Sequence, residues 1–119
     1  MQAINLKQKL ELFTDQWTPK IIANVDDNHI YVAKLEGDFI WHSHDDQDEM
    51  FLVVEGRLRL DFRDKQVWVE EGEVIVVPKG VEHKPYAPDV CSVLIIENAG
   101  TEHTGGIDNP LRKENHERI

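Results

Sequence analysis

The chain has 119 residues, a hydrophobic fraction of 40% and a formal net charge of −10, from 23 acidic and 13 basic side chains. This length predicts one domain, and an acidic chain without a basic stripe argues against nucleic-acid binding. No apolar run approaches a membrane span, and residues 1–13 lack the layout of a secretory signal. Cys91 is the only cysteine and lies in an apolar run, so we expect a buried thiol, no disulfide and a cytoplasmic protein.

Residues 1–19 are expected to form an N-terminal helical segment. Apolar side chains recur there at spacings of three and four residues, namely Leu6, Leu10, Phe13 and Trp17. Asn5 is the predicted N-cap, with Gln8 as its capping-box partner. Pro19 ends the pattern, because proline disfavours a helical residue before it. The helix is expected to cover roughly three turns.

From residue 20 to residue 98 the pattern changes to short strands with turn residues between them. The expected strands are residues 21–23, 29–35, 39–44, 49–54, 58–62, 66–69, 74–77, 81–86 and 92–97. Strands that arrive roughly every eight to twelve residues indicate an all-β sandwich or barrel. The lack of a long helical pattern between them disfavours a parallel α/β sheet.

Residues 99–119 are polar, charged and rich in glycine. We expect an extended or mobile terminus, with a lid or an arm on a partner subunit as alternatives. His103 in this tail is expected to be an exposed loop histidine rather than a residue that folds over the barrel mouth. His29, beside a predicted turn, is expected to be exposed as well.

The most informative motif is His42-Ser43-His44, followed by Glu49. If residues 39–44 are extended, the two imidazoles point to the same face. The polar run 45–48 can reverse the chain and bring Glu49 onto a neighbouring strand. Two imidazoles and a carboxylate on one face can hold a divalent transition metal while leaving coordination positions open. The alternative is that these are ordinary polar surface residues on a strand.

Two spaced blocks of residues extend this motif. The first block comprises Gly37, His42, His44, Glu49 and Gly56, and the second comprises Gly72, Pro78, Gly80 and His83. In these blocks the chain resembles the cupin superfamily, in particular the small single-domain cupins. It departs from their pattern in having four residues between Gly37 and His42, and in having Ala87 where an asparagine is common. The resemblance implies an all-β, double-stranded β-helix (jelly-roll) barrel with a short N-terminal helix, and a homodimer.

The resemblance and the spacing together assign four metal ligands: His42, His44, Glu49 and His83. They suit one divalent transition metal (Fe, Mn, Ni, Co, Cu or Zn), and the sequence does not choose among these. A six-coordinate ion would keep two positions for water, dioxygen or substrate. The acidic residues Asp45, Asp46 and Asp48 are expected to be solvated turn residues. The alternative is that one of them accepts a hydrogen bond from a ligand histidine.

Alternation along the strands predicts which side chains line the barrel interior. Side chains that stand two or four positions from a ligand are expected to face inward. These are Ile40, Phe51, Val53 and Pro85. The cavity is then largely apolar, with the metal at one end. Arg57 and Arg59 are expected to face solvent. The tryptophans Trp17, Trp41 and Trp68 are expected to pack in the core or at an interface.

These patterns predict a metalloenzyme of oxygenase, isomerase or lyase type that acts on a small organic molecule. The alternatives are a non-catalytic module that binds a metabolite or metal, and a metal-free structural cupin. No nucleophilic triad is visible and no catalytic residue is assigned. Tyr86 is a candidate acid or hydrogen-bond donor near His83, with a structural role as the alternative. A weakly polar substrate fits the pocket better than a phosphosugar, which would need a cationic site.

Overall fold

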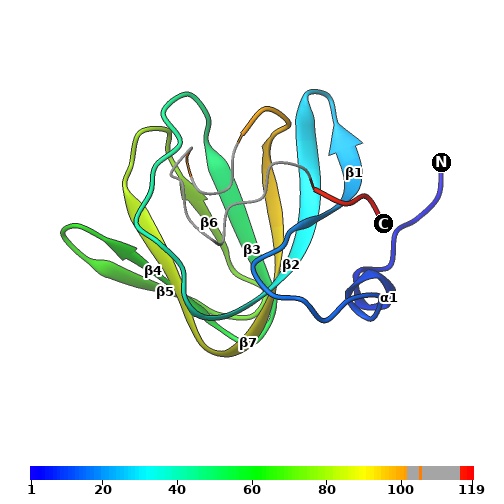
Figure 1. The fold of residues 1–119 in the computed structure, drawn as a ribbon, viewed down its shortest axis with the longest axis horizontal. Helices are drawn as coiled ribbons and strands as arrows, with labels where there is room; N and C mark the ends of the chain where they lie inside the picture. Colours follow the sequence, from blue (N-terminus) through cyan, green and yellow to red (C-terminus); the bar gives the residue numbers. More distant parts are fainter. Residues whose placement is uncertain (102–104, 106–115) are drawn as a thin grey trace.

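The computed structural model describes residues 1–101, 105 and 116–119. One short helix precedes seven strands: α1 (Leu6–Leu10), β1 (Lys20–Val25), β2 (Asn28–Asp38), β3 (Glu49–Glu55), β4 (Leu58–Phe62), β5 (Gln66–Val69), β6 (Val74–Val77) and β7 (His83–Asn98). The strands curl into an antiparallel barrel of jelly-roll type (Figure 1), as the sequence predicts. Among these residues no helix is long and apolar enough to cross a membrane.

The long strand β7 joins the two parts of the barrel. Its first residues pair with β4, and its later residues lie between β2 and β3. The strand order is β1-β2-β7-β3-β6, with β5 attached to β4. The expectation of two separate strands at 81–86 and 92–97 is therefore wrong. The segment between them continues the ladder, and Ala87 pairs with Gly37 of β2.

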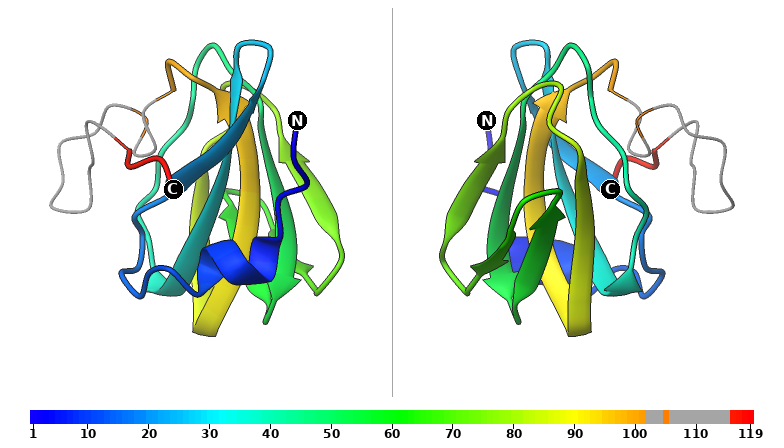
Figure 2. Two further views of the ribbon diagram at one scale, coloured as in Figure 1. Left: turned by 90° about the vertical axis from the view of Figure 1, so that its right-hand side faces the viewer. Right: turned by 90° about the vertical axis from the view of Figure 1, so that its left-hand side faces the viewer.

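The helix is shorter than predicted, at five residues. Asn5 is the N-cap as expected, and its side-chain oxygen accepts a hydrogen bond from the backbone N–H of Gln8 at 3.0 Å. Phe13 packs with Val32 on the outside of the sheet, whereas Trp17 packs against the barrel core. One straight helix could not bring both side chains to these different places, so the chain leaves the helix after Leu10. Figure 2 shows α1 lying against the outer face of the sheet.

The core lies inside the barrel. Alternating side chains of β2, β3 and β7 fill it, including Tyr31, Ala33, Leu35, Phe51, Val53, Val93 and Ile95. This alternation is what half-buried antiparallel strands require. A smaller outer cluster of Leu10, Phe13, Ile22 and Val32 fastens the N-terminal segment to the sheet.

The segment that carries the two histidines is not a regular strand. Residues 39–48 connect β2 to β3, and only His42 forms an isolated bridge, with His83. The backbones of His42 and His83 exchange two hydrogen bonds, at 2.9 and 3.0 Å. The expected strand at 39–44 is therefore wrong. The strand expected at 29–35 runs on to Asp38 as part of β2, with a bulge between Leu35 and Gly37, and the φ of Gly37 is 76°.

The end of the chain returns to β1. Ile21 donates a backbone hydrogen bond to Glu117 at 2.8 Å and accepts one from Ile119 at 3.0 Å. Figure 1 shows the C-terminus beside β1. His103 lies outside the described residues, so its predicted exposure stays a prediction.

Candidate metal centre

Four side chains from three parts of the chain converge inside the barrel. His42 and His44 come from the connection after β2, Glu49 is the first residue of β3, and His83 is the first residue of β7. One potential ligand atom from each lies within 4.8 Å of the others, and all four residues are buried. The structure thus brings together the four residues that the sequence singles out.

Backbone carbonyls orient two of the imidazoles. His42 Nδ1 lies 2.8 Å from the carbonyl oxygen of Ile40, and His83 Nδ1 lies 3.0 Å from that of Val81. Because a carbonyl only accepts hydrogen bonds, each Nδ1 carries a proton, and the Nε2 atom of each ring is the one directed to the other ligands. These backbone partners, and not the neighbouring aspartates, fix the two rings. Asp48 instead accepts a hydrogen bond from the backbone N–H of Lys79 at 2.9 Å.

The Glu49 carboxylate lies among the imidazoles. Its Oε1 is 3.3 Å from His83 Nε2 and 3.4 Å from His44 Nε2. The His44 contact lacks hydrogen-bond geometry, so His44 Nε2 is a buried nitrogen without a hydrogen-bond partner. A buried polar atom of this kind is costly unless something else pairs with it. Three imidazoles and one carboxylate form a donor set that fits a divalent transition metal, and the orphaned nitrogen fits the same ion.

The protonation states also fit a metal site. Burial, followed by the nearby His83, lowers the pKa of His42 to about 4, so its imidazole is neutral at neutral pH. Burial alone would raise the pKa of Glu49, but the side-chain contacts of His44 and His83 hold it below its usual range. Neutral imidazoles and an ionised carboxylate are the forms that bind a metal.

Glu97 is a buried neighbour of the site that the sequence analysis missed. Burial, and then the charge of Glu49, raises the pKa of Glu97 well above its usual range, which favours a protonated carboxyl beside Glu49, and Glu97 Oε2 is a buried oxygen without a hydrogen-bond partner. Alternation could have located it, because Cys91, Val93, Ile95 and Glu97 point to the same side of β7. His29, expected to be exposed, is half-buried, and its Nδ1 lies 3.1 Å from the hydroxyl of Tyr31.

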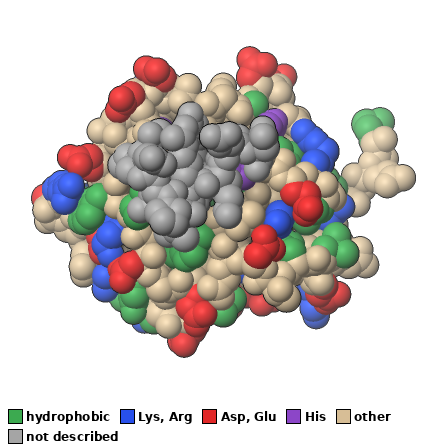
Figure 3. Space-filling view, in the orientation of Figure 1, with side chains coloured by type: hydrophobic (Ala, Val, Ile, Leu, Met, Phe, Trp, Pro, Cys, Tyr) green, Lys and Arg blue, Asp and Glu red, His purple; other side chains and the backbone are tan. Residues whose placement is uncertain are grey.

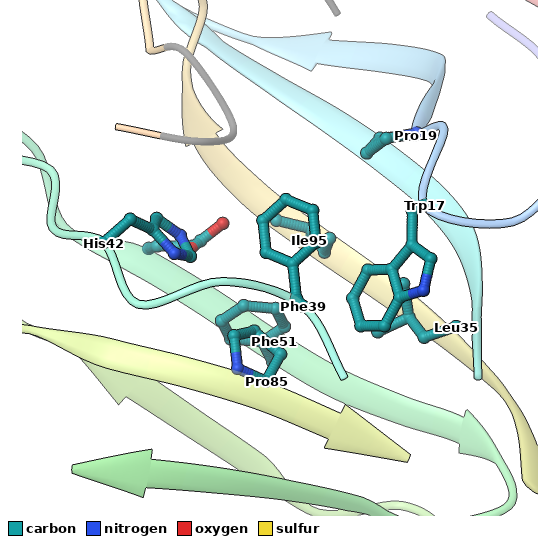
Figure 4. Close-up of a pocket in the computed structure, with 9 residues that line it drawn as sticks. Trp17, Pro19, Leu35, Phe39, His42, Phe51, Pro85 and Ile95 are labelled. Carbon is teal, nitrogen blue, oxygen red and sulfur yellow. The ribbon is translucent and has the colours of Figure 1, made fainter. Parts of the chain in front are cut away.

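A small apolar pocket with a volume of about 30 Å³ adjoins the ligands. It is lined by Trp17, Pro19, Leu35, Phe39, His42, Glu49, Phe51, Pro85 and Ile95 (Figure 4). The predicted inward positions of Phe51 and Pro85 are confirmed. Phe39 takes the place expected for Ile40, because the connection before His42 does not alternate like a strand. Val53 is buried in the core, beyond the pocket lining.

Arg57, just before β4, and Arg59, within β4, lie on the outside of the barrel, as predicted. The guanidinium of Arg57 lies 3.9 Å from the ring centre of Trp68, and that of Arg59 lies 4.4 Å from the ring centre of Tyr86. Tyr86 therefore packs on the outside and does not serve the ligand cluster. Arg63 covers Trp41 in the same way, at 3.9 Å. Figure 3 shows acidic side chains scattered over one face of the molecule, with basic ones between them.

Comparisons with known proteins agree with this architecture. The family model described as cupin domain matches residues 28–97. The protein YdbB of Bacillus subtilis (strain 168) is 39% identical over 64 residues, which are 53% of this chain and 57% of the relative. Acireductone dioxygenase 1 of Vitis vinifera is 36% identical over 59 residues, 45% of this chain and 31% of the relative. The chain thus spans little more than half of the length of YdbB and about a third of the length of acireductone dioxygenase 1.

Among solved structures, a cupin-2 domain containing protein from Shewanella frigidimarina NCIMB 400 is similar throughout its length. It is 46% identical, with a TM-score of 0.80, and the match covers 81% of this chain and 94% of the other. The residues that the family model matches include all four candidate ligands.

Proposed function

The chain belongs to the cupin family, and on that premise we propose that it is a metal-dependent enzyme of oxygenase, isomerase or lyase type. Its substrate is a small organic molecule in the pocket beside the ligand cluster. The observation that carries the proposal is the convergence of four buried ligand atoms within 4.8 Å at the end of an apolar pocket.

Each residue of the cluster has a defined part. His42, His44 and His83 would hold one divalent transition metal (Fe, Mn, Ni, Co, Cu or Zn) through imidazole nitrogens, and Glu49 through its carboxylate. When bound, such an ion supplies Lewis-acid chemistry or activates dioxygen at its open positions. The carbonyls of Ile40 and Val81 keep two imidazoles in their ligand tautomer. The apolar pocket walls exclude water from the substrate.

The comparison with acireductone dioxygenase 1 supports an enzyme of oxygenase type. That relative is a dioxygenase by name, and its 36% identity extends over 59 residues. The match covers 31% of the relative, so the reaction that this chain catalyses has to be identified by assay.

One observation favours the second candidate, a non-catalytic module that binds a metabolite or metal. Within the described part of the chain, His42 and Glu49 are the only ionisable side chains that line the pocket, and both are candidate metal ligands. No further acid or base lies there to move a proton. Catalysis would then depend on groups supplied by the metal or the substrate.

Metal content and turnover test the two candidates together. Protein purified without chelators is analysed by mass spectrometry and then assayed for oxygen consumption and for turnover of a metabolite panel. His42→Ala and His83→Ala should abolish stoichiometric metal binding, whereas His29→Gln, outside the ligand set, should retain it. Full metal content in both alanine variants would defeat the ligand assignment. Metal and ligand binding without turnover would favour the binding module.

A homodimer and a cytoplasmic location are parts of the same proposal. Val74 and Val76 of the edge strand β6 expose 54% and 53% of their surface. Such side chains on an edge strand are suited to a contact with a second copy. The single cysteine is buried and needs no oxidising compartment.

A further inference from the structure

We infer that residues 16–19, a loop between α1 and β1 that carries Trp17, form a lid over the pocket and must swing away from the barrel to admit an organic substrate. This inference rests on the proposed function, because it takes the pocket as the place of the substrate. It identifies the part of the chain that moves, which the ligand cluster alone does not.

The closed pocket is too small for an organic substrate. Its volume is about 30 Å³. A cavity needs roughly 10–15 Å³ to hold one water, so this space holds about two or three water-sized groups. His42 and Glu49, the ligands that line it, expose only 4% and 5% of their surface. A larger molecule reaches them only if one wall of the pocket moves.

Most walls of the pocket are fixed by the sheet. Leu35, Phe51 and Ile95 stand on β2, β3 and β7, and each of these strands pairs with at least two others. Phe39 lies outside the strands, but its backbone N–H donates to the carbonyl of Pro85 at 2.9 Å. Displacement of any of these walls would break backbone hydrogen bonds of the barrel, which is costly.

The wall opposite the ligands belongs to the loop. Trp17 and Pro19 line the pocket from outside the sheet ladders, and Figure 4 shows them at the end away from His42. Trp17 is half-buried, and its ring stacks on Phe39 with centroids 4.8 Å apart. The indole therefore lies between the pocket and solvent, where loops that close over a substrate are found in enzymes.

Internal contacts let the loop move as one piece. Asp15 and Lys20 close its base with an ion pair at 2.9 Å. Within the loop, the hydroxyl of Thr18 donates to the carbonyl of Gln16 at 2.9 Å. Neither contact has to break when the loop swings, so opening needs only the release of its bonds to the barrel.

Hydrogen bonds to β2 hold the loop closed against backbone strain. The backbone N–H of Trp17 donates to the carbonyl of Lys34, and its indole N–H donates to that of Glu36, both at 2.9 Å. The φ of Trp17 is 55°, a conformation that bulky residues rarely adopt. Strain of this kind lowers the cost of opening, and it is frequent at ligand clamps and switch regions.

Hydrogen exchange of the metal-free protein, followed by NMR, tests the motion. The backbone N–H groups of Trp17 and Phe39 each donate a hydrogen bond of 2.9 Å to a backbone carbonyl. If the loop opens while the barrel stays closed, the Trp17 amide should be protected at least about tenfold less than the Phe39 amide. Equal protection of the two amides would overturn the inference, because the loop would then open only together with the barrel.

Ligand size tests whether the loop controls entry. In protein loaded with cobalt(II), stopped-flow absorbance follows the binding of azide, a triatomic ion, and of imidazole, a five-membered ring. Azide fits the closed pocket, whereas imidazole needs an open one. Trp17→Ala should raise the affinity for imidazole about tenfold, because opening no longer costs free energy, and should change that for azide less than about twofold. An imidazole affinity that rises no more than the azide affinity would contradict the lid.

Two further variants control this comparison. Trp17→Phe keeps a ring over the pocket and should gain less affinity for imidazole than Trp17→Ala does. Trp68→Ala is the matched control, because Trp68 lies outside the barrel under Arg57, and it should leave both affinities unchanged. If Trp17→Ala lacks native circular dichroism, hydrogen exchange of the parent protein decides the question alone.

The two experiments separate this inference from the proposed function, since hydrogen exchange needs no metal. Low protection of the Trp17 amide in protein that never takes up cobalt(II) would support the lid and defeat the metalloenzyme. Stoichiometric cobalt(II) with equal protection of both amides would support the metal site and defeat the lid.

Discussion

Glu97 lies opposite Glu49 in the antiparallel pairing of β7 with β3, both carboxyl groups are buried, and the charge of Glu49 helps to raise the pKa of Glu97. We therefore expect Glu97 to position Glu49, a candidate metal ligand. Groups that hold a ligand in place typically change metal affinity about 10- to 100-fold when removed. This contact gives the ligand cluster a support on the strand that lies between β2 and β3.

Replacement of Glu97 should weaken metal binding without removing a ligand. Glu97→Leu is expected to lower the affinity by about 10- to 100-fold, because Glu49 loses the polar carboxyl that faces it from β7. Glu97→Gln keeps a hydrogen-bond donor and should restore most of the affinity. Competition titration with a metal indicator measures both, with the exposed Glu55→Gln on β3 as the control. Equal loss in the leucine and glutamine variants would contradict a positioning role.

The metal-free protein should lose stability in mild acid because of His42. Its pKa is lowered from 6.5 to about 4, so below pH 6.5 the unfolded chain binds a proton that the folded chain does not. Stability contributed by the neutral ring is present above pH 6.5 and lost as the pH falls towards 4. The loss from this residue approaches about 3 kcal/mol.

Urea unfolding between pH 7 and pH 4 measures this effect. His42→Asn keeps a polar side chain that does not titrate, so the free energy of unfolding should depend less on pH in this variant. A pH dependence as steep as that of the parent protein would exclude His42 as its source.

Cys91 should be unreactive in the folded protein. Burial, and then the charge of Glu71, raises the pKa of its thiol to about 12, so little thiolate exists at neutral pH. Reaction with a disulfide reagent at pH 8 should be very slow in buffer and complete in urea. Rapid labelling without denaturant would mean that β7 opens near Cys91.

The exposed valines of β6 should govern self-association. The protein should elute as a dimer in size-exclusion chromatography with light scattering. Val74→Lys combined with Val76→Lys should shift it to a monomer, because charged edge strands resist pairing. Val90→Lys, at a site that is 48% exposed on β7, is the control. A dimer that survives the double substitution would place the interface elsewhere.

The sequence predicts the ligand cluster and most strands because both depend on short, local spacings. His42, His44 and Glu49 stand within one short segment, the resemblance to the cupins adds the more distant His83, and the alternation in β3 correctly predicts Phe51 as a pocket residue.

The remaining features depend on contacts that are distant in sequence. Phe39 enters the pocket because the chain before His42 follows the bridge to His83 instead of a strand pattern. Trp17 reaches the same pocket through a left-handed turn that no periodicity predicts. Glu97 could be found from alternation, but its proton depends on the facing carboxylate of Glu49.

A crystal structure with anomalous diffraction at transition-metal edges tests the metal centre most directly. We expect one anomalous peak per chain, about 2.0–2.2 Å from the Nε2 atoms of His42, His44 and His83 and from a carboxylate oxygen of Glu49. Density in the adjoining pocket would also identify a bound ligand. Protein soaked with Fe, Mn, Ni, Co, Cu or Zn that shows no peak among these four residues would contradict the account.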